Sequence, residues 1–164
     1  MFGLNLHHSD LRTNPEQQAI PTGWIAEIGP LENQLYAHTL EVCETFAVEN
    51  LYSELITIGN EIPAGMLWST GSYENPENLA HLLHAAARAV RRPSLGGHTK
   101  VVIHLAHGYD DELQYWFYDL VFNIGYISLD DWDVIAVSFY LSWGEDATMD
   151  ALTASLTSLA TQYR

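Results

Sequence analysis

Short apolar runs alternate along the chain with longer segments in which apolar residues recur every three or four positions. The short runs lie at residues 2–7, 55–61, 100–105 and 133–140, and each has the length of a buried strand. A helix-length segment follows each run. Strands that are separated by helices are typical of βαβ units with a parallel sheet. The pattern therefore predicts one α/β domain over residues 1–164, made of four strand–helix units.

The helical segments have recognisable faces and ends. Asn75 precedes a proline and is expected to cap the second helix, and Gly125 is expected to close the third helix, residues 110–124, in a left-handed conformation. The last helix is predicted at 148–163. The first helix, residues 31–50, places five residues on one stripe: Leu31, Leu35, Thr39, Val42 and Phe46. Three aromatic residues of the third helix are expected in the core: Trp116, Phe117 and Tyr118.

Two architectures are compatible with four strand–helix units. They form either an independent α/β domain or half of an eightfold barrel. The sequence begins within a predicted strand and stops at the end of a predicted helix. We therefore expect a segment from the middle of a (β/α)8 barrel, a TIM barrel that is present only in part.

The second predicted strand ends in an amide and a carboxylate, Asn60 and Glu61, directly after an apolar run. A buried strand has no structural need for such residues at its tip. In parallel barrels, side chains at the carboxyl ends of the strands face the active site. Glycosidases need a carboxyl group that protonates the leaving oxygen, and an amide can hold a sugar hydroxyl. The pair is therefore a candidate for glycosidase chemistry, although a carboxylate and a turn amide at the surface would be the simpler interpretation.

Composition narrows the possible partners and cofactors. The formal net charge is −15, with only six Lys and Arg residues, which argues against nucleic acid and against an anionic membrane surface. An apolar fraction of 48% is ample for a packed core. The histidines show no HExxH arrangement, so neither a metal nor another cofactor is expected. Cys43 is the single cysteine and is expected to be buried. No signal peptide and no membrane-spanning run is recognised.

Several segments together resemble glycoside hydrolase family 53, the arabinogalactan endo-β-1,4-galactanases. Residues 6–21 contain LHHSD, then NP, Gln18 and Pro21, and are similar to the family pattern LHYSDxWADPxxQxxP. Residues 58–68, with IGNEI and AGMLW, are similar to the family's fourth strand and the loop after it. IHL at 103–105 and VSFY at 137–140 look like the fifth and sixth strands. The resemblance covers nearly the whole chain in the same order.

The resemblance implies a TIM barrel, a retaining mechanism with two carboxylates, and β-1,4-galactan or arabinogalactan as the substrate. Glu61 matches the general acid/base, and Asn60 matches the amide that binds the sugar 2-hydroxyl. Four further residues fall where the family lines its cleft, and a fifth lies in a loop beside it: His7, Asp10, His104 and Tyr140, then Trp68. The family's nucleophile lies in a segment that would follow the end of this sequence. The family is secreted, so the resemblance implies an extracellular location.

The chain departs from the family pattern at several cleft positions, including Arg12, Pro63 and residues 106–109. These departures leave open a related barrel glycosidase that acts on glucans or mannans. A second alternative is a catalytically inactive remnant that at most binds sugar. Simpler structural roles also stay open for the four cleft residues. His7 and His104 are then hydrogen-bonded core histidines. In the same interpretation Asp10 caps a loop and Tyr140 caps the core. Ser9 and Ser138 have no neighbouring signal of a serine hydrolase.

Overall fold

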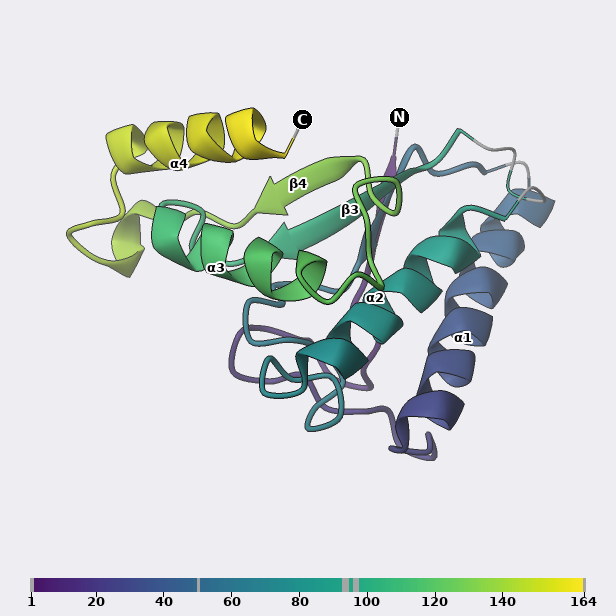
Figure 1. Ribbon diagram of the computed structural model, residues 1–164. Coiled ribbons are helices and arrows are strands. Elements are labelled where there is room, and N and C mark those ends of the chain that lie inside the picture. Colours follow the sequence, from purple (N-terminus) through teal and green to yellow (C-terminus); the bar gives the residue numbers. More distant parts are fainter. Residues whose placement is uncertain (1, 50, 93–94, 96–97, 164) are drawn as a thin grey trace.

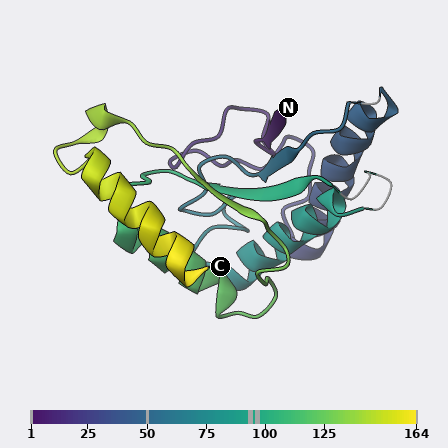
Figure 2. The same ribbon diagram turned by 90° about the horizontal axis from the view of Figure 1, so that it is seen from above.

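The computed structural model describes residues 2–49, 51–92, 95 and 98–163, and these form a single four-stranded parallel sheet. The strands lie in the order of the sequence, each paired with the next: β1 Gly3–Leu6, β2 Leu55–Ile58, β3 Lys100–Leu105 and β4 Val134–Val137. One helix follows each strand: α1 Ile28–Val48, α2 Pro76–Val90, α3 Asp111–Phe122 and α4 Met149–Gln162. The helices form an arc along one side of the sheet (Figures 1 and 2). The predicted succession of four βα units is confirmed.

The two faces of the sheet differ in chemistry because successive side chains of a strand point to opposite faces. The pairing aligns Leu4 of β1 with Ile56 of β2 and then Val101 of β3, and this row packs into the apolar core beneath the helices. The next row begins with Asn5 and Thr57 and lies on the other face. Polar groups are therefore concentrated on the face that the helices leave free.

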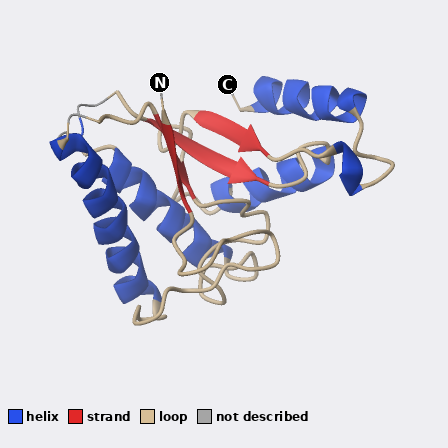
Figure 3. Cartoon of the chain, turned by 180° about the vertical axis from the view of Figure 1, so that it is seen from behind, coloured by secondary structure: helices blue, strands red, loops and turns tan. Residues whose placement is uncertain are grey.

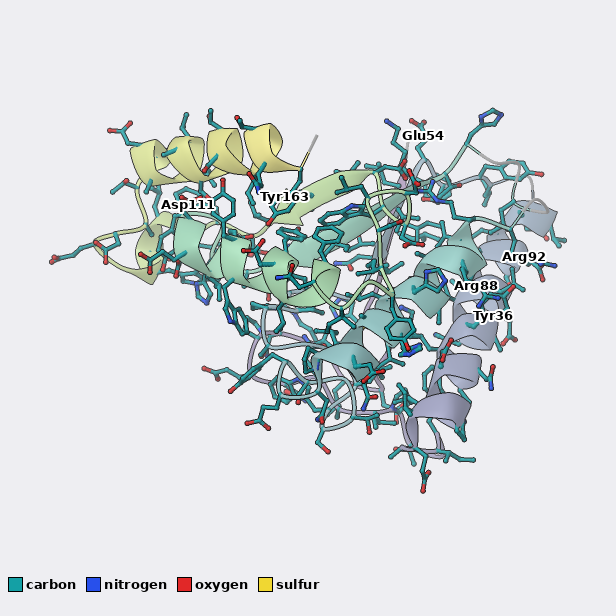
Figure 4. All side chains as sticks on the ribbon, in the orientation of Figure 1. Tyr36, Glu54, Arg88, Arg92, Asp111 and Tyr163 are labelled. Carbon is teal, nitrogen blue, oxygen red and sulfur yellow. The ribbon has the colours of Figure 1, made fainter. Side chains whose placement is uncertain are left out.

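Helices α1 and α2 are packed closely through small and apolar residues. The buried side of α2 is rich in alanine and leucine, and the buried side of α1 carries Leu31, Leu35, Thr39 and Cys43. Cys43 therefore takes the place on the stripe that the periodicity assigned to Val42, which is only half-buried. At the outer edge of this contact the guanidinium of Arg88 lies 5.5 Å from the ring centroid of Tyr36 (Figure 4). A cation over an aromatic face adds a weak electrostatic attraction to the packing.

The strands are shorter than the sequence predicted. β2 ends at Ile58 and β4 at Val137, so Glu61 and Tyr140 belong to the loops that follow the strands. At β2 the strand stops because Gly59 and Glu61 adopt positive φ angles of 104° and 51°, which a strand cannot continue through. α1 begins earlier than expected, at Ile28, with a proline in its first turn.

Three local predictions need correction or refinement. Asn75 stands at the N-cap of α2, but its side-chain amide donates to the carbonyl of Ser69 instead of capping the helix. Trp116 is 42% exposed, whereas its neighbours Phe117 and Tyr118 are fully buried as expected. Gly125 has the expected left-handed φ of 79°, although α3 already ends at Phe122.

The loops after β1 and β2 lie against each other beyond the strand ends (Figure 3). The backbone N–H of Trp68 donates to the carbonyl of Gln18 at 2.7 Å, and the hydroxyl of Thr70 donates to the carbonyl of Ala26 at 2.6 Å. These bonds join segments that are more than forty residues apart in the sequence. The loops therefore form a fixed wall beside the strand tips, where the candidate site lies.

Candidate active site

Glu61 is held at the carboxyl end of β2 between the tips of its two neighbouring strands. Upstream, the N–H of Gly59 donates to the carbonyl of Leu6 at 3.0 Å. Downstream, the N–H of Ile62 donates to the carbonyl of His104 at 3.1 Å. The residue is 8% exposed, and within the described residues no hydrogen bond reaches its carboxylate. A buried carboxyl group that has no protein partner is available to a ligand.

Asn60 is oriented by two hydrogen bonds of its side-chain amide. Its Oδ1 accepts from Nδ2 of Asn5 at 2.7 Å, and its Nδ2 donates to the carbonyl of Thr13 at 2.9 Å. An amide nitrogen carries two hydrogens, so one N–H remains for another acceptor. The geometry allows Asn60 to donate to a hydroxyl group while its orientation stays fixed.

His7 lies beyond the end of β1 and has a defined tautomer. The backbone N–H of Thr13 donates to Nδ1 of His7 at 3.0 Å, so Nδ1 is the acceptor and the neutral ring carries its proton on Nε2. Burial lowers the pKa of His7, the nearby Arg12 guanidinium lowers it further, and the negative charge of Glu61 opposes both. His7 is therefore a neutral N–H donor at neutral pH.

His104 on β3 completes the group around Glu61. Its Nε2 lies 2.9 Å from the hydroxyl oxygen of Ser138, just beyond β4. Burial lowers the pKa of His104, the charge of Glu61 raises it, and His7 lowers it again. The structure thus brings together four of the predicted site residues, Glu61, Asn60, His7 and His104, at the tips of three adjacent strands.

The other three predicted site residues lie further out. Asp10 is exposed and its Oδ2 accepts from the N–H of Thr22 at 2.7 Å, a bond that lowers the pKa of its carboxyl group. The indole N–H of Trp68 donates to the carbonyl of Ala64, so the polar end of this ring is used within its own loop. Tyr140 is 50% exposed. In the described part of the chain, no hydrogen bond or ring contact joins these side chains to the group around Glu61.

An aromatic cluster beyond β3 and β4 is a feature that sequence reasoning missed. The ring of Trp143 lies 4.7 Å from His107 and 4.6 Å from Tyr140, centroid to centroid, and Tyr109 contacts His107. Such rings offer flat apolar faces and polar edges at the rim of a site. Of these residues the family resemblance indicated only Tyr140, because the contact of Trp143 depends on the short 3₁₀ helix Leu141–Trp143 that folds it back.

Gln18 and Thr13 were also missed as supporting residues. The hydroxyl of Thr13 lies 2.9 Å from Nδ1 of His7 and 3.3 Å from the carbonyl oxygen of Asn60. The side-chain amide of Gln18 donates to the carbonyls of Asn60 and Glu61 at 2.9 and 3.1 Å. Gln18 belongs to the family-like segment at 6–21, which was the only available signal for its importance.

Two other kinds of site were sought over the same residues. Among the described residues, no three His, Cys, Asp or Glu side chains are arranged to hold a metal ion. No helix in the described ranges is long and apolar enough to cross a membrane.

Comparison with known families identifies the group to which this arrangement belongs. The family model described as "Glycosyl hydrolase family 53" matches residues 1–164. The chain belongs to glycoside hydrolase family 53. The "Probable arabinogalactan endo-beta-1,4-galactanase A" of Aspergillus flavus is 43% identical over 161 residues, and the "Arabinogalactan endo-beta-1,4-galactanase A" of Emericella nidulans is 42% identical. Each match covers 98% of this chain and 46% of the relative, so the family 53 chain spans about half the length of these relatives.

Solved structures of the family have the same fold. A structure from a study of two fungal β-1,4-galactanases superposes with a TM-score of 0.95 at 38% identity, covering 97% of this chain and 48% of that one. The family 53 catalytic domain of Ignisphaera aggregans gives a TM-score of 0.87 at 33% identity, over 98% and 42% of the two chains. The four βα units are therefore a partial (β/α)8 barrel, and the resemblance to family 53 is confirmed.

Proposed function

We propose that this chain carries the acid/base half of the active site of an endo-β-1,4-galactanase that acts on galactan or arabinogalactan. The observation that carries the proposal is the position of Glu61. It is a buried carboxyl group at a strand tip, unpartnered among the described residues, beside two imidazoles with lowered pKa and an oriented amide. The names of the family relatives supply the substrate class.

In the proposed reaction Glu61 protonates the glycosidic oxygen as the bond to the anomeric carbon breaks. A second carboxylate attacks that carbon, and Glu61 later removes a proton from the water that releases the sugar. Asn60 donates its free N–H to the sugar 2-hydroxyl, and His7 presents Nε2–H to the same space. Asp10, Trp68 and Tyr140 are proposed to border the cleft further out.

The second carboxylate is proposed to come from a part of the barrel outside these four βα units. A retaining mechanism places the two carboxyl groups about 5–5.5 Å apart. Within the described residues, no carboxylate is hydrogen-bonded or ion-paired with Glu61, and the groups whose pKa responds to its negative charge are His7 and His104. By itself the chain would then bind galactan with little or no turnover, which is the second candidate function. An extracellular location is part of the same proposal, because the substrate is a wall polysaccharide.

The test is release of reducing sugar from β-1,4-galactan, combined with calorimetric binding of galactotetraose. Three proteins are compared: the wild type, Glu61→Gln, and the control Glu41→Gln at an exposed position of α1. Loss of general acid catalysis costs about 10²–10⁴-fold in rate. Turnover that is lost in Glu61→Gln but kept in Glu41→Gln supports the acid/base role of Glu61 and contradicts a second carboxylate from outside these four βα units. Binding without turnover supports the sugar-binding alternative. Preference for glucan or mannan, or no interaction with any of the three polymers, contradicts the proposal.

A further inference from the structure

Two buried glutamines bind the backbone in the same way at neighbouring strand tips. Nε2 of Gln18 donates to the carbonyls of Asn60 and Glu61 at 2.9 and 3.1 Å and is also within 3.0 Å of the carbonyl of Asn14, so its two hydrogens are shared among three acceptors. Nε2 of Gln114 donates to the carbonyls of Ala106 and His107 at 2.9 and 3.1 Å. Gln18 is 2% exposed and Gln114 is fully buried. One comes from the loop after β1 and the other from α3, so the repetition does not follow from a repeated sequence.

Each pair of carbonyls belongs to the two peptides that lie immediately before and after a residue with left-handed backbone. Glu61 has φ of 51° and His107 has φ of 55°. A residue other than glycine is strained in this region and persists there only when its surroundings hold it. In both places the amide nitrogen bridges the carbonyl of the left-handed residue and the carbonyl of the residue before it. A rotation about the φ or ψ bond of the left-handed residue would change the spacing of its two carbonyls and break one or both bonds.

We infer that Gln18 is a positioning residue that holds the left-handed backbone of Glu61 and so fixes where its carboxylate lies. The N–H groups of Gly59 and Ile62 are bonded to the adjacent strand tips, and Gln18 binds the two carbonyls between them. The backbone of this short segment is thereby held from both sides. Gln114 does the same for His107, which supports the aromatic cluster with Trp143. The importance of Gln18 for catalysis rests on the proposed function, but its effect on Glu61 does not.

The inference is tested with the matched variants Gln18→Met and Gln114→Met, which remove the same buried amide from two neighbouring tips. The readout is the pKa of His104, measured by NMR of the imidazole, because the carboxylate of Glu61 raises it. Glu61→Gln shows how far this pKa falls when the charge is removed. We expect Gln18→Met to lower it by most of that amount, because the carboxylate moves away. Gln114→Met is expected to leave it near the wild-type value.

The outcomes separate positioning from general stabilisation. A folded Gln18→Met protein with a wild-type His104 titration overturns the inference, and so does an equal shift in both variants. Should Gln18→Met not fold, Gln18→Leu removes the same amide without adding a charge near His104, and it is measured in the same way. Failure of both Gln18 variants to fold, while Gln114→Met folds, also overturns the inference, because the side chain then serves the fold as a whole.

An activity measurement distinguishes this inference from the proposed function. In a protein that hydrolyses galactan, we expect Gln18→Met to lower kcat by 10-fold or more, as an order of magnitude for a misplaced acid, with little change in KM. In a protein that does not hydrolyse galactan, the His104 titration still decides whether Gln18 positions Glu61. Absence of galactan hydrolysis therefore counts against the proposed function alone. The His104 titration decides separately whether Gln18 positions Glu61.

Discussion

Replacing His8 is expected to remove part of the acid sensitivity of the fold. His8 follows β1, adopts a left-handed φ of 52° and is 4% exposed. Neither ring nitrogen has a hydrogen-bond partner among the described residues, and the ring lies edge-on to His38 at 5.9 Å. Burial, followed by the charges of His38 and His7, lowers the pKa of His8 from 6.5 to about 3. The buried ring is therefore neutral in the folded protein.

The size of the effect follows from the difference in pKa between the folded and unfolded chains. Each unit corresponds to about 1.4 kcal/mol, so the difference amounts to about 5 kcal/mol in total. Because the pKa is lowered on folding, this stability is fully present above pH 6.5 and is lost as the pH falls toward 3. Near pH 5 the unfolded chain is almost fully protonated at this position and the folded chain is not. The loss there is about 2 kcal/mol relative to neutral pH.

The assay is urea-induced unfolding, followed by tryptophan fluorescence at about pH 7.5 and about pH 5. In His8→Asn the side chain is neutral at both pH values, and asparagine tolerates the left-handed backbone. We expect the variant to lose about 2 kcal/mol less than the wild type between the two conditions. His98→Asn, the same substitution at an exposed histidine, controls for removing a histidine from the unfolded chain. Equal losses in the wild type and His8→Asn would refute the reasoning.

Four further substitutions test the packing and the backbone. Tyr118→Phe removes a buried hydroxyl that has no partner within the described residues, so we expect about 1 kcal/mol of added stability; a lower melting temperature would contradict this. Arg91→Ala breaks a partly exposed ion pair with Asp133 and should lower the free energy of unfolding by less than about 1 kcal/mol. Asp133→Ala breaks the same pair and also leaves the buried N–H of Val101 in β3 without its acceptor, so it should cost about 1–3 kcal/mol. Equal costs in urea titrations would count against that distinction. In Gly65→Ala the new methyl group clashes with the carbonyl of Gly71, and the backbone at position 65 has a φ of 87°, which is strained for alanine. We therefore expect the free energy of unfolding, measured by thermal unfolding, to fall by more than about 1 kcal/mol. An unchanged melting temperature would rule out the clash.

Much of the architecture could be predicted because it depends on local patterns. Apolar runs and helical periodicity located all four βα units, and parallel strands place the residues at their carboxyl ends on one edge. That rule, together with the family resemblance that singled out the two histidines, was enough to bring Glu61, Asn60, His7 and His104 together. The expected core position of Trp116 was wrong, and Asn75 takes the predicted N-cap position without the capping bond of its side chain, because both outcomes depend on neighbours outside the helical pattern. The loop carbonyl of Ser69 competes for the amide of Asn75, and Trp116 lies on a side of α3 that its neighbours leave open.

The amino-acid sequence by itself determined the family, the order of the units and the identity of the candidate acid/base. These follow from residue types and spacings that act over a few positions or along one strand. Only the tertiary structure decided how Glu61 is held, because its left-handed backbone depends on an amide from Gln18, forty-three residues away. It also decided that the ring of His8 meets no hydrogen-bond partner among the described residues, and that Trp143 folds back onto His107. Such contacts arise when separate segments close around one another, and no periodicity within a single segment specifies them.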